Sequence, residues 1–172
     1  IVTLLAWDFA KYVAHYLTHK IPVLWEFHKV HHAAEVLTPI SAFRAHPFDI
    51  MIDLFFRLLF TGVVGGVFAY FYPGGIKELS ILGFNAVAFA IYYWIAHLQH
   101  SHIQLGYGPM SRLLVSPVMH QVHHSCYVHH WDKNFGFLFG LWGWMFRTLH
   151  IPERDEPYRL GLPQGSSQYA TV

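Results

Sequence analysis

Two long apolar runs constrain the fold of this chain more than any other feature of its sequence. The first run extends from Ile50 to Tyr72, and the second extends from Leu79 to Leu98. Each run is about twenty residues long, which is the length a helix needs to cross a hydrocarbon core of roughly 30 Å. Because Pro73, Gly74 and Gly75 begin a short turn between them, we expect an antiparallel transmembrane hairpin. The alternative is a buried hairpin in a soluble helical bundle.

The composition favours the membrane interpretation. Apolar residues make up 54% of the chain and charged residues only 12%, whereas soluble domains carry about 25% charged residues. The formal net charge of +1 provides no electrostatic footprint for nucleic acid, so we expect no nucleic-acid partner. The single cysteine, Cys126, excludes an internal disulfide and a cysteine-rich zinc site. The sequence therefore predicts an all-α integral membrane protein in which imidazole is the main metal-binding group.

A hairpin would place the segments on either side of it in one compartment. Residues 20–48 and the chain from Leu105 onward would then form a helical cap on the same membrane face. The positive-inside rule makes this face cytoplasmic. The basic residues that indicate this side are Lys20, Lys29, Arg44, Arg112, Lys133, Arg147, Arg154 and Arg159.

We interpret residues 1–172 as a single domain. Helices are expected over residues 1–19 and 23–35, the hairpin over 50–72 and 79–98, and a polar surface tail over 152–172. The chain begins with Ile1 and lacks an initiating methionine. We therefore expect an N-terminal truncation, with one or two membrane segments upstream.

Histidine carries the strongest functional signal. The pattern His-x-x-His-His occurs at His28, His31 and His32 and recurs in the second half of the chain, and each copy follows another histidine pair. On a helix, residues i+3 and i+4 flank residue i, and their directions differ by about 100°. One triplet could therefore serve two neighbouring metal ions, with four or five nitrogens for each ion. The expected ligands are His15, His19, His28, His31, His32, His100, His120, His123 and His124, with His97 as a possible tenth.

The ligand type alone leaves the metal open, because imidazole suits zinc, copper, iron and nickel. Structural zinc is satisfied by four ligands, so it does not account for so many histidines. Asp8, Asp132 and Asn134 could orient ligand imidazoles through their second ring nitrogen. For Asp132 and Asn134, a loop-capping role is an equally good interpretation.

Several segments resemble the fatty acid hydroxylase superfamily, also called the sterol desaturase family. The first half of the family pattern is matched by Asp8-Phe-Ala-Lys-Tyr-Val-Ala-His15-Tyr-Leu-Thr-His19, Leu24-Trp-Glu-Phe-His28-Lys-Val-His31-His32 and Ser41-Ala-Phe-Arg44-Ala-His46-Pro47. The second half is matched by Gln99-His100-Ser-His102, Pro117-Val-Met-His120-Gln-Val-His123-His124-Ser125, Asp132-Lys-Asn134-Phe-Gly136 and Tyr158-Arg159-Leu-Gly161-Leu162. Two positions depart from it: His102 stands where asparagine is common, and Glu26 stands where a basic residue is common.

The resemblance implies a membrane enzyme with two non-haem iron ions bound by histidine, facing the cytoplasm in a bacterial inner membrane or the endoplasmic reticulum. It implies O2-dependent hydroxylation or desaturation of a sterol, fatty acyl or sphingolipid-like lipid. Electrons would come from cytochrome b5 or ferredoxin with its reductase. Two other classes stay open: a metal-dependent membrane lipid hydrolase and a non-enzymatic haem-binding or metal-binding protein.

Overall fold

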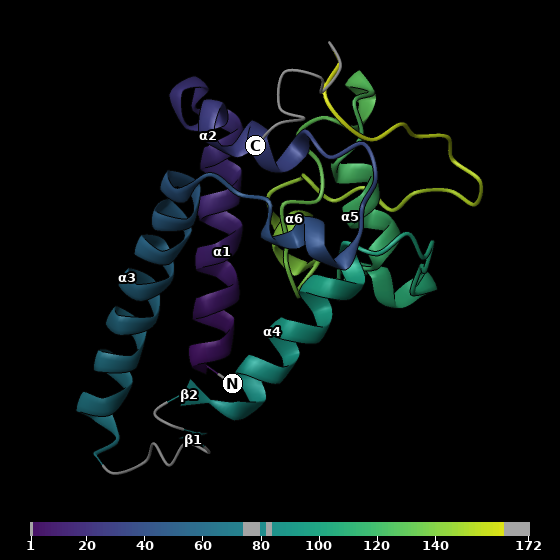
Figure 1. Cartoon of the computed structure of the whole chain (residues 1–172). Helices are drawn as coiled ribbons and strands as arrows, with labels where there is room; N and C mark the ends of the chain where they lie inside the picture. Colours follow the sequence, from purple (N-terminus) through teal and green to yellow (C-terminus); the bar gives the residue numbers. More distant parts are fainter. Residues whose placement is uncertain (1, 74–79, 82–83, 164–172) are drawn as a thin grey trace.

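The computed structural model describes residues 2–73, 80–81 and 84–163. Helix α1 (Val2–Lys20) leads almost directly into α2 (Pro22–His32), as the apolar and histidine patterns predicted. Pro22 occupies the first turn of α2, where its missing N–H would have no helical partner in any case. The two helices therefore meet at Ile21 (Figure 1), and the rings of His19 and His32 lie 4.7 Å apart between their centroids.

Helix α3 (Pro47–Phe71) packs mainly against α1 and runs beside it in the opposite direction (Figure 1). The short 3-10 helix η1 (Pro39–Phe43) precedes it. The ring of His46 accepts a hydrogen bond from the backbone N–H of Phe48, and Pro47 occupies the first turn. These features start the helix where the apolar run begins.

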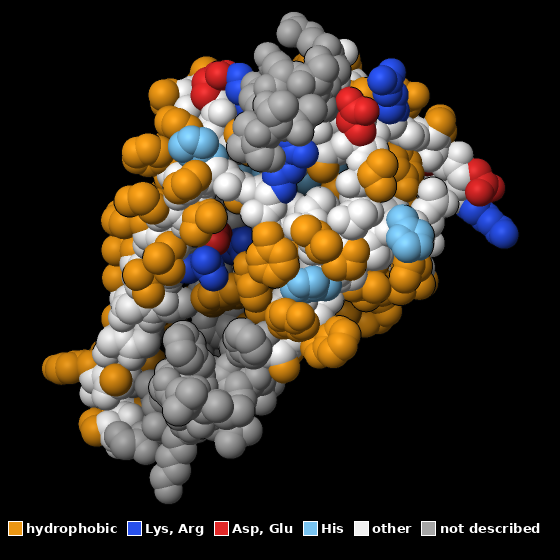
Figure 2. Space-filling model, viewed as in Figure 1, with side chains coloured by type: hydrophobic (Ala, Val, Ile, Leu, Met, Phe, Trp, Pro, Cys, Tyr) orange, Lys and Arg blue, Asp and Glu red, His pale blue; other side chains and the backbone are white. Residues whose placement is uncertain are grey.

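The outward side of α3 is an exposed apolar surface. No residue of α3 is buried, and Figure 2 shows apolar side chains along its length. Among the described residues, α3 is the one helix long and apolar enough to span a membrane. An exposed surface this apolar is typical of contact with lipid or with another protein. Its large exposed side chains include Phe48, Ile50, Met51, Leu54, Phe55, Leu58, Leu59, Val63, Val67, Tyr70 and Phe71.

The second apolar run differs from the predicted membrane helix. The two-residue strands β1 (Ser80–Ile81) and β2 (Phe84–Asn85) pair with each other, and α4 (Ala86–Gln99) begins only after them. The 14 residues of α4 extend about 21 Å, which is less than a hydrocarbon core requires. Residues 79 and 82–83 of the run lie outside the described residues. The main helical partner of α3 is thus α1, not a second twenty-residue span.

The C-terminal half consists of short elements packed against α1, α2 and α4. These elements are η2 (Gly108–Arg112), α5 (Pro117–His123), η3 (Val128–His130) and α6 (Leu141–Met145). Phe135, Met119 and Val122 are completely buried among them. This small core holds α5 in place beneath the histidines of α1 and α2.

The polar tail is more firmly attached than the sequence predicted. The N–H of Cys126 donates to the carbonyl of Arg159 over 2.8 Å, and the hydroxyl of Tyr158 donates to Gln121 Oε1 over 2.7 Å. Glu156 contacts the Nε2 atoms of His130 and His150. These contacts fasten residues 152–163 to the domain at a few points, although the segment stays largely at the surface. The rest of the tail, 164–172, lies outside the described residues.

Candidate metal centre

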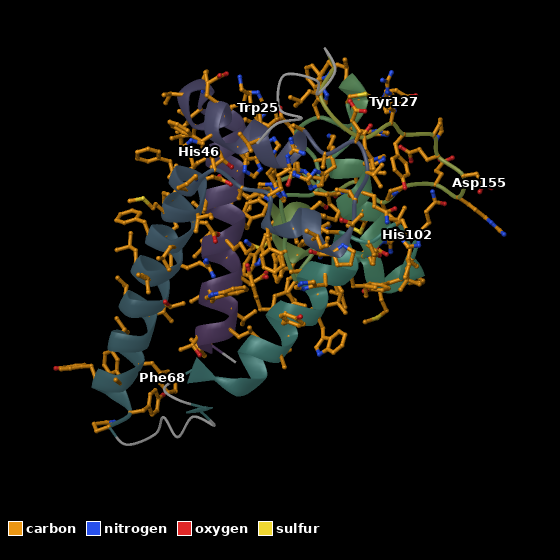
Figure 3. All side chains as sticks on the ribbon, in the orientation of Figure 1. Trp25, His46, Phe68, His102, Tyr127 and Asp155 are labelled. Carbon is orange, nitrogen blue, oxygen red and sulfur yellow. The ribbon has the colours of Figure 1, made fainter. Side chains whose placement is uncertain are left out.

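The predicted histidines converge where α1, α2, α5 and the end of α4 meet. Nitrogen-bearing side chains crowd the space between α2 and α5 in Figure 3. Two histidines that do not take part, His46 and His102, lie at opposite edges of the molecule (Figure 3). The converging ligand atoms form two groups, each with all its atoms within 4.8 Å of one another. The first group is His15, His19, His28, His32 and His123, and the second is His31, His100, His120 and His124.

Both triplets are divided between the two groups. In the first triplet, His28 and His32 join the first group and His31 joins the second. In the second triplet, His123 joins the first group and His124 joins the second. This division follows from the diverging directions of neighbouring residues on a helix. It agrees with the expectation that each triplet serves both ions, with five nitrogens in one group and four in the other.

Backbone carbonyls hold several of the imidazoles in one orientation. The Nδ1–H groups of His15 and His31 donate to the carbonyls of Phe135 and Arg44, each over 3.0 Å. In the same way, His100 donates to Ala96 over 3.0 Å and His123 to Lys133 over 2.7 Å. A carbonyl can only accept, so the proton of each ring is on Nδ1 and the lone pair is on Nε2. The Nε2 atoms therefore point into the clusters with a lone pair that can bind a metal ion.

A carboxylate performs this role for His28. Both oxygens of Asp49 accept from His28 Nδ1, at 3.0 and 3.1 Å. A carboxylate behind a ligand histidine fixes the ring and increases the basicity of its other nitrogen. Asp49 was not among the residues predicted from the sequence. The available signal was its position two residues after Pro47, in the first turn of the long apolar helix.

Burial favours the neutral form of most of the clustered imidazoles. Desolvation, followed by repulsion from neighbouring imidazoles, lowers the pKa of His32, His120 and His124 well below the ordinary value of 6.5. Burial also lowers the pKa of His100 to about 4 and that of His123 to about 3. In each case the hydrogen bond that the ring donates to a backbone carbonyl raises the pKa and offsets part of this effect. Neutral imidazole is the form that binds metal. The clusters are therefore ready for a cation at neutral pH.

The contacts between ring nitrogens test whether a metal fits. His31 Nε2 and His100 Nε2 lie 3.1 Å apart, yet both rings carry their proton on Nδ1, so two lone pairs face each other. Nitrogens bound side by side to one ion, with bonds of about 2.1 Å, lie roughly 3 Å apart. The Nε2 atoms of His15, His28 and His123 are buried without a hydrogen-bond partner among the described residues. A bound cation resolves both the facing lone pairs and the unpaired nitrogens.

The structure places the other predicted residues away from the clusters. His97 is half-buried, donates to the carbonyl of Tyr93 and packs against Phe43. In the described contacts, neither Asp132 nor Asn134 reaches an imidazole. Asp132 pairs with Lys20 at the surface, and the amide of Asn134 binds the backbone around it.

Asp8 likewise has a different role from the one predicted. Its carboxylate accepts from the backbone N–H groups of Leu138 and Phe139 and from Trp142 Nε1, at 2.7 to 3.2 Å. Asp8 thus joins α1 to α6 and to the segment that precedes it. The sequence did not show these partners because they lie far from Asp8 along the chain.

A cavity of about 310 Å³ opens onto the histidines. Five clustered histidines line it, together with apolar side chains that include Phe43, Tyr92 and Phe137. Four charged residues from α1 and α3 also line it: Lys11, Asp49, Asp53 and Arg57. Small-molecule sites commonly combine such an apolar wall with a few polar groups.

Comparisons with known proteins agree with the site. The model of the fatty acid hydroxylase family matches residues 1–148. The chain is 26% identical over 155 residues to ornithine lipid hydroxylase OlsE of Rhizobium tropici. The aligned stretch covers 90% of this chain and 43% of that protein. It is 26% identical over 156 residues to alkylglycerol monooxygenase of Homo sapiens, and this alignment covers 91% of this chain and 32% of that protein.

The corresponding enzyme of Danio rerio is 28% identical over 166 residues, covering 96% of this chain and 33% of that protein. The chain thus spans less than half the length of these relatives. No solved structure matches it significantly. The family model covers most of the chain, including both histidine triplets. The chain belongs to the fatty acid hydroxylase family.

Proposed function

We propose that the full-length protein is an O2-dependent membrane enzyme that hydroxylates or desaturates a lipid, with two non-haem iron ions held by nine histidines. Residues 1–172 would form its single catalytic domain. The observation that carries this proposal is the convergence of nine imidazoles into two adjacent, buried groups. His97 is left out of the proposed ligand set because its ring is directed elsewhere.

Iron is favoured by the chemistry that the relatives' names describe. Imidazole would also accept zinc, copper or nickel, but zinc has no redox chemistry. A metal that carries out the chemistry of a hydroxylase or a monooxygenase must be able to exchange electrons with O2. When bound, two iron ions would activate O2 for attack on an unactivated C–H bond.

The chain's own residues would orient the ligands and exclude water. The carbonyls of Phe135, Arg44 and Lys133 keep three rings in the tautomer that presents Nε2, and Asp49 does so for His28. The apolar wall of the cavity would hold the lipid chain beside the histidines, since water has few partners there. Holding one carbon of the lipid close to the metal site would determine which C–H bond reacts.

We further propose that the active site faces the cytoplasm and receives electrons from cytochrome b5 or from ferredoxin with its reductase. The support for the orientation is the set of Lys and Arg residues outside the apolar runs. The candidate span α3 begins close to the histidines, because Asp49 in its first turn contacts His28. The metal centre would therefore lie at the membrane surface, where both a lipid and a soluble electron carrier can reach it.

Metal analysis and turnover of the full-length protein in detergent test this function. We expect two iron ions per chain and consumption of O2 and reductant in proportion to oxidised lipid. Lipid analysis of a host that expresses the full-length protein, compared with a His123→Ala control, would identify the product. Lipid cleavage without consumption of O2 would instead identify a hydrolase, and an active preparation without iron would contradict the proposal.

A further inference from the structure

Three charged side chains lie on the inner side of the candidate membrane span. Asp53 and Arg57 are on α3, and Arg57 binds Asp53 at 2.6 Å. Lys11 of α1 faces them, with its amine 3.5 Å from Asp53. All three line the cavity that opens onto the histidines. Figure 2 shows a group of basic and acidic side chains beside the apolar surface of α3.

The depth of these charges argues for a functional role. On α3, Asp53 and Arg57 follow Pro47 by roughly 9 and 15 Å along the helix axis, which brings Arg57 about halfway through a hydrocarbon core. Their neighbours Leu54, Phe55 and Leu58 are exposed on the outer side. Ionisable residues at such depth are costly, and they usually mark a site that binds or transfers something polar.

The charges of this group do not balance. It contains two cations, Lys11 and Arg57, but one carboxylate, Asp53. The nearest further carboxylate in the cavity lining, Asp49, is engaged with His28 at the metal centre. Among the described residues, Asp53 is therefore the one carboxylate that contacts both cations, and an anion that enters this partly desolvated cavity would be attracted to the N–H donors that Asp53 leaves unused.

Both cations also retain unused hydrogen-bond donors. Arg57 Nε is buried without a partner among the described residues. The 3.5 Å separation between Lys11 and Asp53 is longer than a good charged hydrogen bond. The cationic groups are positioned over aromatic rings: Arg57 lies over Trp7 and Lys11 over Phe137, at 5.5 and 5.1 Å from the ring centroids. These contacts orient both groups but leave their N–H donors available.

We infer that Lys11 and Arg57 bind the anionic headgroup of the lipid substrate, a carboxylate or a phosphate. This inference rests on the proposed function, because the same cavity would hold the lipid beside the metal centre. Its volume of about 310 Å³ is at the lower end of the usual range for ligand sites. The headgroup and the oxidised carbon share this small space, so oxidation takes place close to the polar end of the lipid.

Equilibrium binding of matched single-chain lipids tests the inference without turnover. The metal-loaded full-length protein, in a neutral detergent and without reductant, is titrated with palmitate, hexadecyl phosphate and hexadecanol at about pH 8.5, where both acids are ionised. We expect at least one of the two anions to bind about tenfold more tightly than the neutral alcohol. Equal affinities for all three lipids would overturn the inference, whatever the variants do.

Substitutions then assign the preference to the two cations. Lys11→Gln and Arg57→Gln should each remove most of the preference for the anion while affinity for hexadecanol is retained. Arg112→Gln removes a cation at an exposed position outside the cavity, so it should preserve the preference. An equal loss in the Arg112 variant would contradict the assignment. Metal content and thermal unfolding, measured on each variant, identify any that misfolds.

The binding result is separable from the proposed function. If the preference for anions is found but the protein consumes no O2, the headgroup site stands and the oxygenase proposal fails. If O2 is consumed with neutral lipids and the anions have no advantage, the oxygenase proposal stands and the headgroup site is wrong.

Discussion

Single residues set the orientation of the candidate ligands in this protein, and Asp49 is the clearest example. Both of its oxygens face His28 Nδ1, so Asp49→Asn should weaken metal binding at the first cluster by about tenfold to a hundredfold. Competition with a chelator measures this effect. Glu26→Gln is the matched control, since Glu26 is exposed and pairs with Lys29. Unchanged metal affinity in Asp49→Asn would show that this carboxylate does not support the cluster.

His97 and His100 are three residues apart, but only His100 lies among the candidate metal ligands. His100 Nε2 lies 3.1 and 3.2 Å from the Nε2 atoms of His31 and His120, whereas His97 binds the backbone of its own helix. We expect His100→Ala to lower the metal content and His97→Ala to preserve it, as measured by elemental analysis of purified protein. Loss of metal in the His97 variant would restore this residue to the ligand set.

At the scale of elements, Asp8 determines how α1 is attached to the C-terminal half. Its buried carboxylate accepts three hydrogen bonds, and an asparagine would turn an N–H group toward one of these donors. Asp8→Asn should therefore destabilise the protein by about 2–3 kcal/mol. Thermal unfolding in detergent measures the change.

Asp132→Asn provides the control for this substitution. It removes an exposed ion pair with Lys20, and asparagine tolerates the positive φ of 61° at this position. We expect less than about 1 kcal/mol of destabilisation. A similar loss of stability in the two variants would mean that the hydrogen bonds of Asp8 add nothing beyond the general effect of removing a carboxylate charge.

At the scale of the whole molecule, the exposed side of α3 is the part that the proposed membrane would cover. Leu58 is 64% exposed on this surface, so Leu58→Lys should oppose insertion by about 2.5–3.5 kcal/mol. Alkaline extraction of membranes from expressing cells measures how much protein remains inserted. Leu113→Lys, at a position 54% exposed outside the span, should leave extraction unchanged. Full retention of the Leu58 variant would contradict a membrane-facing role for this surface.

The predicted transmembrane hairpin shows which part of the fold hydropathy could predict and which part it could not. Hydropathy located α3 correctly, because an uninterrupted apolar run is visible in the sequence itself. It overextended the second helix, because the same property does not distinguish a helix from the short paired strands at Ser80–Ile81 and Phe84–Asn85. The packing of α3 on α1 was also missed, because the short turn between the two apolar runs indicated the second run as the partner of α3.

By itself, the sequence indicated which histidines could form a two-metal site and that each triplet could serve both ions, because the helical repeat fixes the directions of neighbouring side chains. The family followed from the order of the same motifs. Only the tertiary structure decided which groups orient the imidazoles and which charges line the cavity. Asp49, the carbonyl of Phe135 and Arg57 reach the site through contacts between distant segments. Such contacts depend on how the helices pack, which local spacing along the chain does not encode.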